Sequence, residues 1–149
     1  MDSKALKASW IIVLIVNCIV VILGLIVMIA PEVFLIGEFE GYTGTNWSDH
    51  ISSNPDAAFL TRLQFTQTGW YIFSMGVIAT LITILFYKNG DKRSWYILLI
   101  FTVMGWGGSL AYDLPTGEMT TIMMIVIFFI IGLFGLALGA KPILKGSSS

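Results

Sequence analysis

Residues that carry redox and metal chemistry are scarce in this chain, which has one cysteine and one histidine. The cysteine, Cys18, has no partner within the chain, so thiol–disulfide chemistry is excluded for the chain alone. A single histidine cannot supply the paired axial ligands of a membrane haem protein. Charge is also scarce, since only 11% of the 149 residues are charged and no carboxylate lies deep in an apolar run. A carrier that moves protons through a buried acid is therefore not expected.

Apolar residues make up 56% of the sequence and give it a mean hydropathy of +0.87, well above that of an ordinary soluble domain. Four apolar runs are each long enough to cross a hydrocarbon core of about 30 Å as a helix. They lie near residues 9–30, 66–87, 94–112 and 119–140. The sequence therefore predicts an all-α fold, a four-transmembrane-helix bundle, with residues 1–146 as a single domain. Residues 147–149 are expected to be a flexible tail, either native or left over from expression.

The charged residues divide unevenly between the two ends of these runs. Seven of the eight basic residues flank one end: Lys4, Lys7, Lys88, Lys92, Arg93, Lys141 and Lys145. Most of the acidic residues and the remaining basic residue, Arg62, lie at the other end. Because basic residues mark the cytoplasmic side of a membrane protein, both termini are predicted to be cytoplasmic and residues 31–65 to form an external loop.

The predicted external loop is too long for a simple turn, and we expect it to be structured. Asn54 can cap a helix that starts at Pro55, so the second long helix is expected to begin before the membrane and to include Arg62. The acidic and aromatic residues of the loop are candidates for contact with a partner protein. They are Glu38, Glu40, Tyr42, Trp47, Asp49 and His50.

The stretch FLTRLQFTQTGWY, residues 59–71, places many hydrogen-bonding groups at the start of the second apolar run. A polar cluster is predicted there, either for a ligand or for structure. It comprises Arg62, Gln64, Gln67, Trp70, Trp106 and Asp113. Three roles are open for Arg62: it reaches lipid headgroups, it pairs with a carboxylate, or it binds a ligand. Asp113 is the preferred carboxylate, and Glu118 and Glu38 are the alternatives.

Small residues recur at helical spacing in all four runs, as expected where membrane helices approach one another closely. The residues predicted to pack between helices are Asn17, Gly24, Gly69, Gly76, Gly105, Gly108, Gly132, Gly135 and Gly139. Asn17 is predicted to make an interhelical hydrogen bond. The spacing of Gly135 and Gly139 fits either packing within the protein or a homodimer face.

Neither a metal site nor a catalytic site is predicted. Asp49 and His50 adjoin in the loop, but adjacent side chains rarely point at one ion. Methionines in apolar helices are ordinary packing residues. No phosphate-binding motif and no pair of nucleophile and base is visible, so an enzymatic role is the least favoured. Nucleic acid is not an expected partner.

Four segments carry a resemblance to a known family. They are APE (residues 30–32) at the end of the first span, FLTRLQFTQTGW (59–70) at the start of the second helix, KNGDKRSW (88–95) in the basic turn, and GGSLAYDLPTGE (107–118) before the last helix. Together they resemble the DoxX-like superfamily of small four-helix membrane proteins over nearly the whole chain. The resemblance implies a four-helix bundle with an arginine-centred polar cluster at one end, and accessory, assembly or scaffold roles. No family catalytic residue carries over.

These observations favour a non-enzymatic integral membrane subunit or scaffold of a membrane protein complex. Its expected partners are the lipid bilayer and other membrane subunits or further copies of the chain. The alternative is a small membrane module that binds or transports a quinone, a lipid or another apolar ligand at the polar cluster at the external end of the bundle. No cofactor is predicted. A lipid or quinone would be a ligand only under this alternative hypothesis.

Overall fold

The computed structural model describes residues 4–145, and within that range the protein is all-helical. The four long helices are α1 (Lys4–Ile29), α4 (Pro55–Leu85), α5 (Lys92–Asp113) and α6 (Met119–Lys145). The connection between α1 and α4 holds two short helices, α2 (Glu32–Thr43) and α3 (Trp47–Ser53). Two 3-10 turns, η1 (Tyr87–Asn89) and η2 (Leu114–Thr116), follow α4 and α5. The predicted tail of residues 147–149 lies outside the described residues.

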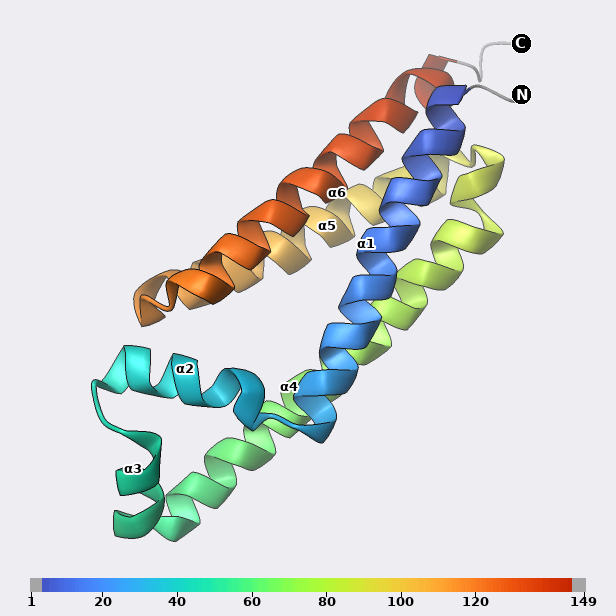
Figure 1. Ribbon diagram of the computed structural model, residues 1–149. Coiled ribbons are helices and arrows are strands. Elements are labelled where there is room, and N and C mark those ends of the chain that lie inside the picture. The colour runs from blue at the N-terminus through green and yellow to red at the C-terminus, as the bar shows by residue number, and fades with distance from the viewer. Residues whose placement is uncertain (1–3, 146–149) are drawn as a thin grey trace.

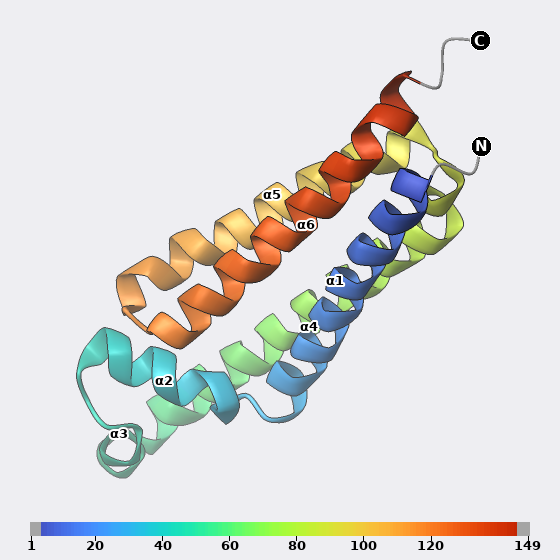
Figure 2. The same ribbon diagram turned by 45° about the horizontal axis from the view of Figure 1, so that its top comes forward.

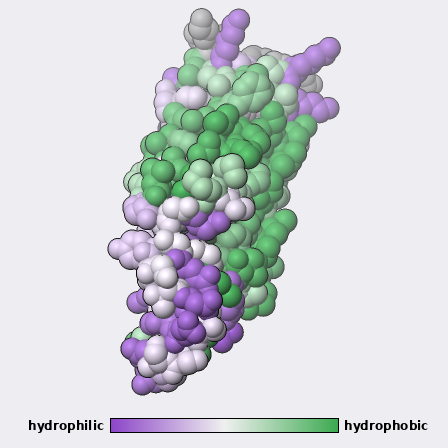
Figure 3. All heavy atoms as spheres, turned by 60° about the vertical axis from the view of Figure 1, so that its left-hand side comes forward, coloured by the Kyte–Doolittle hydropathy of each residue, from purple (hydrophilic) through white to green (hydrophobic). Residues whose placement is uncertain are grey.

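Four helical segments are long and apolar enough to cross a membrane, which indicates a multi-pass membrane protein. They are α1, α4 with η1, α5 with η2, and α6. Figure 3 shows the corresponding surface, a broad apolar band between polar groups at one end and the polar surface around α2 and α3 at the other. The prediction of four transmembrane helices in an all-α fold is confirmed to this extent.

The long helices form an arc with one open side. Helix α1 packs along α4 and also contacts α6, and α6 in turn packs against α5. Helices α4 and α5 have few contacts with each other, and Figures 1 and 2 show them diverging from the turn that joins them. We call this open side the α4–α5 seam. In a closed bundle α4 and α5 would pack against each other. Here the seam leaves room between them at the end of the protein where α2 and α3 lie.

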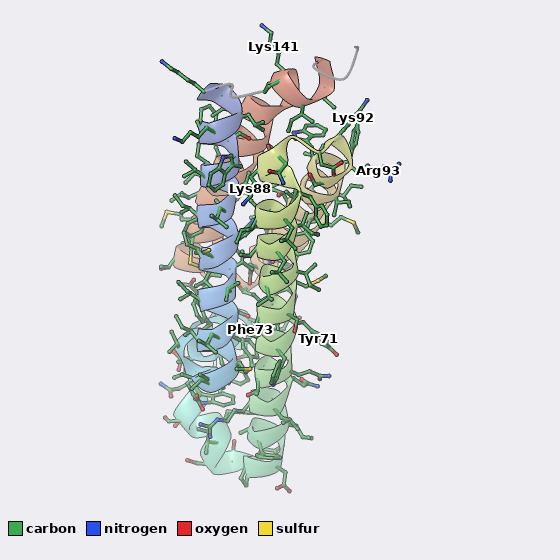
Figure 4. The ribbon with its side chains drawn as sticks, turned by 90° about the vertical axis from the view of Figure 1, so that its right-hand side faces the viewer. Tyr71, Phe73, Lys88, Lys92, Arg93 and Lys141 are labelled. Carbon is green, nitrogen blue, oxygen red and sulfur yellow. The ribbon has the colours of Figure 1, made fainter. Side chains whose placement is uncertain are left out.

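Glycines explain why α1 and α4 lie so close together. A Cβ added at Gly24 would collide with the backbone of Phe73, and one at Gly69 would collide with the backbone of Met28. Gly76 faces Val21 in the same way, at 2.8 Å from its backbone nitrogen. Figure 4 shows Phe73 on the side of α4 that faces α1, whereas Tyr71 points away from the bundle. Small residues thus allow the backbone contact that stabilises helix pairs in lipid.

Buried hydrogen bonds cross between the helices away from α2. Asn17 donates to the Thr83 hydroxyl at 3.0 Å, which joins α1 to α4 as predicted for Asn17. The Ser9 hydroxyl donates to the carbonyl of Gly135 at 2.6 Å and joins α1 to α6. A part-buried bond joins α5 to α6, in which Trp95 donates its indole N–H to the carbonyl of Leu136 at 2.9 Å. In an apolar solvent these bonds satisfy groups that would otherwise have no partner.

The glycines of α6 and α5 differ in what they face. Gly135 lies against Ile12 and Val13 of α1, and Gly139 lies against Ser9 and Tyr87, so both pack within the protein. By contrast, a Cβ at Gly105 or Gly108 would meet nothing within 4 Å. The prediction that these two glycines pack between helices is therefore wrong within the described chain. They lie on a face of α5 that neither α4 nor α6 covers.

The two ends of the bundle differ in charge. Lys88, Lys92, Arg93 and Lys141 gather towards the end at which α1 begins and α6 ends, which we call the basic end (Figure 4). The opposite end, which we call the acidic end, carries α2 and α3. There Asn54 caps α4 by accepting a hydrogen bond from the Ala57 N–H, and Pro55 is the first residue of the helix. The predicted start of this helix is thus confirmed.

Candidate ligand cavity

Helix α2 folds back across the acidic end and packs against the turn between α5 and α6. A Cβ added at Gly41 would lie 2.6 Å from the carbonyl oxygen of Thr116, and one at Gly37 would lie 3.3 Å from Cγ of Glu118. These two glycines are four residues apart and therefore share one face of α2. This close approach places the neighbouring face of α2 over the α4–α5 seam.

A half-open cavity of about 480 Å³ lies between α2, the first turns of α4 and the end of α5, and Tyr42 and Tyr112 in its wall are largely exposed. Helix α2 contributes Leu35, Glu38, Phe39 and Tyr42, whose spacing places them on one helical face, and also Thr43. The other residues that line the cavity are Thr61, Phe65, Ala111, Tyr112, Pro115 and Thr116. Four of the lining side chains are aromatic, and Glu38 is the only one that carries a formal charge. The cavity is thus an apolar, aromatic site with one acid in its wall.

A small second core supports this cavity. Leu35, Trp47 and Ala58 are buried together, and Phe39 and Phe65 pack against them. Trp47 also donates its backbone N–H to the Glu40 carboxylate at 2.9 Å, which fixes α3 to α2. Because Phe39 and Phe65 take part in both the core and the cavity wall, the shape of the cavity depends on packing rather than on a loose loop.

Glu38 has an unusual electrostatic environment for a carboxylate in the connection between α1 and α4. Burial, and to a smaller extent the nearby charges of Asp113 and Glu118, together raise the pKa of Glu38 from 4.5 to about 7. Close to neutral pH, Glu38 therefore exchanges between its charged and neutral forms. A group in this state responds strongly to any charge that enters the cavity.

Asp113, the last residue of α5, is 5% exposed, and its Oδ1 atom has no hydrogen-bond partner among the described residues. It directly follows Tyr112 in the cavity wall and is close enough to Glu38 for its charge to act there. Buried carboxylate oxygens are normally paired, because an unpaired one loses the hydration it has in water. Asp113 is thus an acceptor without a donor beside the cavity.

Glu118 has a different role from these two carboxylates. It accepts hydrogen bonds from the backbone N–H groups of Thr120 and Thr121 in the first turn of α6. These bonds lower the pKa of Glu118, because they favour its charged form. Glu118 therefore remains ionised and adds a fixed negative charge next to α2.

Arg62 does not join this group of acids. It forms an ion pair with Glu32, the first residue of α2, and its side chain is 59% exposed. The predicted pairing of Arg62 with Asp113 is therefore wrong, and so are the alternatives Glu118 and Glu38. The physical reason is the path of α2, which starts beside α4 and so brings Glu32 to Arg62 while α5 is held away by the open seam.

The remaining residues of the predicted polar cluster do not converge either. Gln64, Gln67 and Trp70 are exposed on α4, and Gln67 donates to the hydroxyl of Tyr71 at 3.0 Å. Trp106 stacks on Phe128 of α6, with ring centroids 5.7 Å apart. Asp113 alone lies beside the cavity. The predicted cluster is thus divided between exposed residues of α4 and separate positions on α5 instead of enclosing a site.

Five of the six residues predicted for partner contact divide into two groups. Glu38 and Tyr42 line the cavity, while Glu40, Trp47 and His50 hold α2 and α3 together. His50 also contacts the ring of Phe39, at a centroid distance of 4.7 Å. Asp49 is exposed.

Sequence reasoning missed the aromatic residues that build the cavity and the two glycines that position α2. The sequence did contain the signal, because Gly37 and Gly41 have the small-xxx-small spacing that we sought only in the long helices. Residues 35, 38, 39 and 42 also have the spacing of a single helical face.

The cavity wall holds hydroxyl groups and one carboxylate, but no histidine, cysteine or lysine is among the described residues that line it. No group of three or more histidine, cysteine, aspartate or glutamate residues that could hold a metal ion occurs within residues 4–145. The arrangement of aromatic walls and isolated carboxylates suits non-covalent binding of a small molecule. No protein-family model, curated protein or solved structure matches the chain.

Proposed function

We propose that this protein is a small membrane module that binds an amphiphilic ligand in the cavity between α2, α4 and α5. The observation that carries this proposal is a cavity of about 480 Å³ at the open α4–α5 seam. Its volume lies within the range of about 300–1,000 Å³ that is usual for small-molecule sites. The seam gives a lipid or another apolar molecule a lateral path from the bilayer, and α2 covers the site on the side away from the membrane.

Native mass spectrometry of the protein, extracted gently from its own membrane, tests this proposal with Ala111→Trp as the variant. Ala111 lines the cavity, so a tryptophan there would fill much of its volume. Ala137→Trp is the matched control, because Ala137 is exposed on α6, away from the cavity. We expect a bound small molecule on the natural protein and on the control, and its loss from Ala111→Trp. A bare chain in all three samples, or equal occupancy in all three, would contradict the proposal.

A second candidate function is that of a DoxX-like subunit or scaffold in a membrane complex. The open face of α5 favours it, because Gly105 and Gly108, three residues apart on one side of the helix, have no neighbour within 4 Å of an added Cβ. Another membrane helix could approach such a face closely. The same mass spectra test this candidate, since a scaffold would retain further subunits or further copies of the chain.

For the orientation we propose that the basic end is cytoplasmic and that α2 and α3 lie on the other side of the membrane. The proposal rests on the gathering of lysine and arginine at one end (Figure 4). Because α1 begins and α6 ends at this same end, both termini would be cytoplasmic.

A further inference from the structure

We infer that the cavity selects an amphiphile with a positively charged primary amine head, whose head group binds at Glu38, close to the charge of Asp113, while its chain lies in the α4–α5 seam. This inference rests on the proposed function, because it names the chemical class of the ligand for the same cavity. Four features of the described residues support it: the aromatic walls, the carboxylates, the absence of a neutralising cation and the open seam.

The walls suit a cation that is partly removed from water. Phe39, Tyr42, Phe65 and Tyr112 all line the cavity. The faces of aromatic rings carry negative electrostatic potential and attract ammonium groups, most strongly where water is excluded. A neutral ligand would gain the apolar contact with these rings but not the electrostatic attraction.

The carboxylates supply the charge and the acceptor that an ammonium group needs. Glu38 lies in the wall itself, and the Oδ1 atom of the buried Asp113 lacks a hydrogen-bond donor. A primary ammonium group has three N–H donors, and Glu38 in the wall offers it a carboxylate acceptor. A charge-assisted hydrogen bond there would offset the burial of Glu38, and the negative charge of Asp113, which acts on Glu38, would add to the attraction.

Within residues 4–145, no basic side chain forms an ion pair with Glu38 or Asp113. Arg62, the basic residue at this end of the bundle, pairs with Glu32 instead. Anionic head groups are disfavoured, because Glu38, Asp113 and Glu118 would repel them. A single metal ion is also disfavoured, because these carboxylates do not form a group that could hold one. The charge pattern therefore selects an organic cation.

The position of the cavity favours an amphiphile over a small cation from water. Its lining includes Leu35, Ala111 and Pro115 in addition to the aromatic rings, so an alkyl chain has apolar surface to contact. Along the seam, α4 and α5 have few contacts and leave a path for such a chain toward the bilayer. Burying the chain would add affinity in proportion to its length.

Equilibrium binding to the full chain in phosphatidylcholine nanodiscs tests the inference, with empty nanodiscs subtracted. The labelled probes are dodecylamine, dodecanol, which has the same chain and no charge, and butylamine, which has the charge and a short chain. Near neutral pH we expect dodecylamine to bind about tenfold more tightly than dodecanol. Glu38→Gln and, separately, Asp113→Asn should remove most of this difference. Asp49→Asn, which removes an exposed charge outside the cavity, should preserve it.

Each outcome separates this inference from the proposed function. If dodecanol binds as tightly as dodecylamine, and Ala111→Trp weakens both, the cavity binds apolar ligands and the selectivity for amines is wrong. If butylamine binds as tightly as dodecylamine, the alkyl chain adds no affinity. The ligand is then a cation from water, and the inference that it is an amphiphile is wrong. If no probe binds beyond empty nanodiscs, the inference is overturned, and the mass spectra of the natural protein decide the proposed function independently. Circular dichroism of each variant shows whether it has folded.

Discussion

At Glu38, burial and two neighbouring carboxylates act in the same direction. Each disfavours the ionised form, and the pKa of Glu38 rises to about 7. The acids that face it are Asp113 at the end of α5 and Glu118 before α6, while Thr61 and Phe65 of α4 bring no charge. Glu38 therefore destabilises the empty protein whenever it is ionised. A cationic ligand would reverse this effect, so the same residue links binding to pH.

The first prediction at this scale concerns the stability of the ligand-free protein. The pKa of Glu38 is 4.5 without these neighbours and about 7 in the folded protein, so the folded state binds the extra proton between these values. The contribution of Glu38 to stability is then most favourable at low pH and decreases as the pH rises from 4.5 to 7. Glu38→Gln should increase the unfolding free energy near pH 8 by roughly 1–2 kcal/mol, a value reduced to allow for partial solvent exposure. Near pH 5 the variant should differ little from the natural protein.

Thermal unfolding in a neutral detergent at both pH values measures this effect. Asp49→Asn serves as the control, because it removes one exposed carboxylate from the same end without entering the cavity. Equal stability of Glu38→Gln and the natural protein near pH 8 would show that Glu38 is not held in a desolvated, acidic environment.

At the scale of elements, α2 determines whether the cavity exists. It has no long apolar run, and it is held between α4 and the α5–α6 turn by Leu35 in the small core and by the contact of Gly41 with Thr116. Removing this contact should free one wall of the cavity and leave the packing of α1 on α4 unchanged, because different glycines support that packing.

Gly41→Ala tests the role of this contact. The added Cβ would lie 2.6 Å from the Thr116 carbonyl oxygen, which is backbone and cannot move aside as a side chain would. We expect a loss of about 1–3 kcal/mol in stability and faster amide hydrogen exchange in residues 32–43. Gly108→Ala is the control, because its Cβ would face open space. Equal exchange rates in both variants would contradict the proposed packing of α2.

How well the sequence predicts each element depends on whether local or tertiary interactions determine it. The long helices follow from hydropathy, and the start of α4 follows from Asn54 and Pro55, because both signals are local. The partner of Arg62 could not be predicted in this way, since Glu32 reaches it only through the path of α2. The cavity also depends on the path of α2. Tertiary packing determines this path, and the distribution of charge along the sequence does not reveal it.

At the scale of the whole molecule, the cavity lies at the end opposite to the one where the basic residues gather. The basic end carries lysine and arginine, whereas the acidic end carries Glu38, Asp113 and Glu118 around the cavity. If the basic end is cytoplasmic, the cavity lies at the level of the opposite leaflet. Its ligand would then come from that leaflet or from outside, and a cytoplasmic ligand would have no direct access.

Cysteine labelling in intact cells tests this orientation. Cys18, the only cysteine, is first replaced by serine, and single cysteines are introduced as Ser52→Cys in α3 or Asn89→Cys in η1. Both original residues are exposed and uncharged, so the charge difference between the two ends is preserved. A membrane-impermeant maleimide should label Ser52→Cys in intact cells and Asn89→Cys only after permeabilisation. The reverse pattern would place the cavity in the cytoplasmic leaflet, so that its amphiphile would have to come from inside the cell.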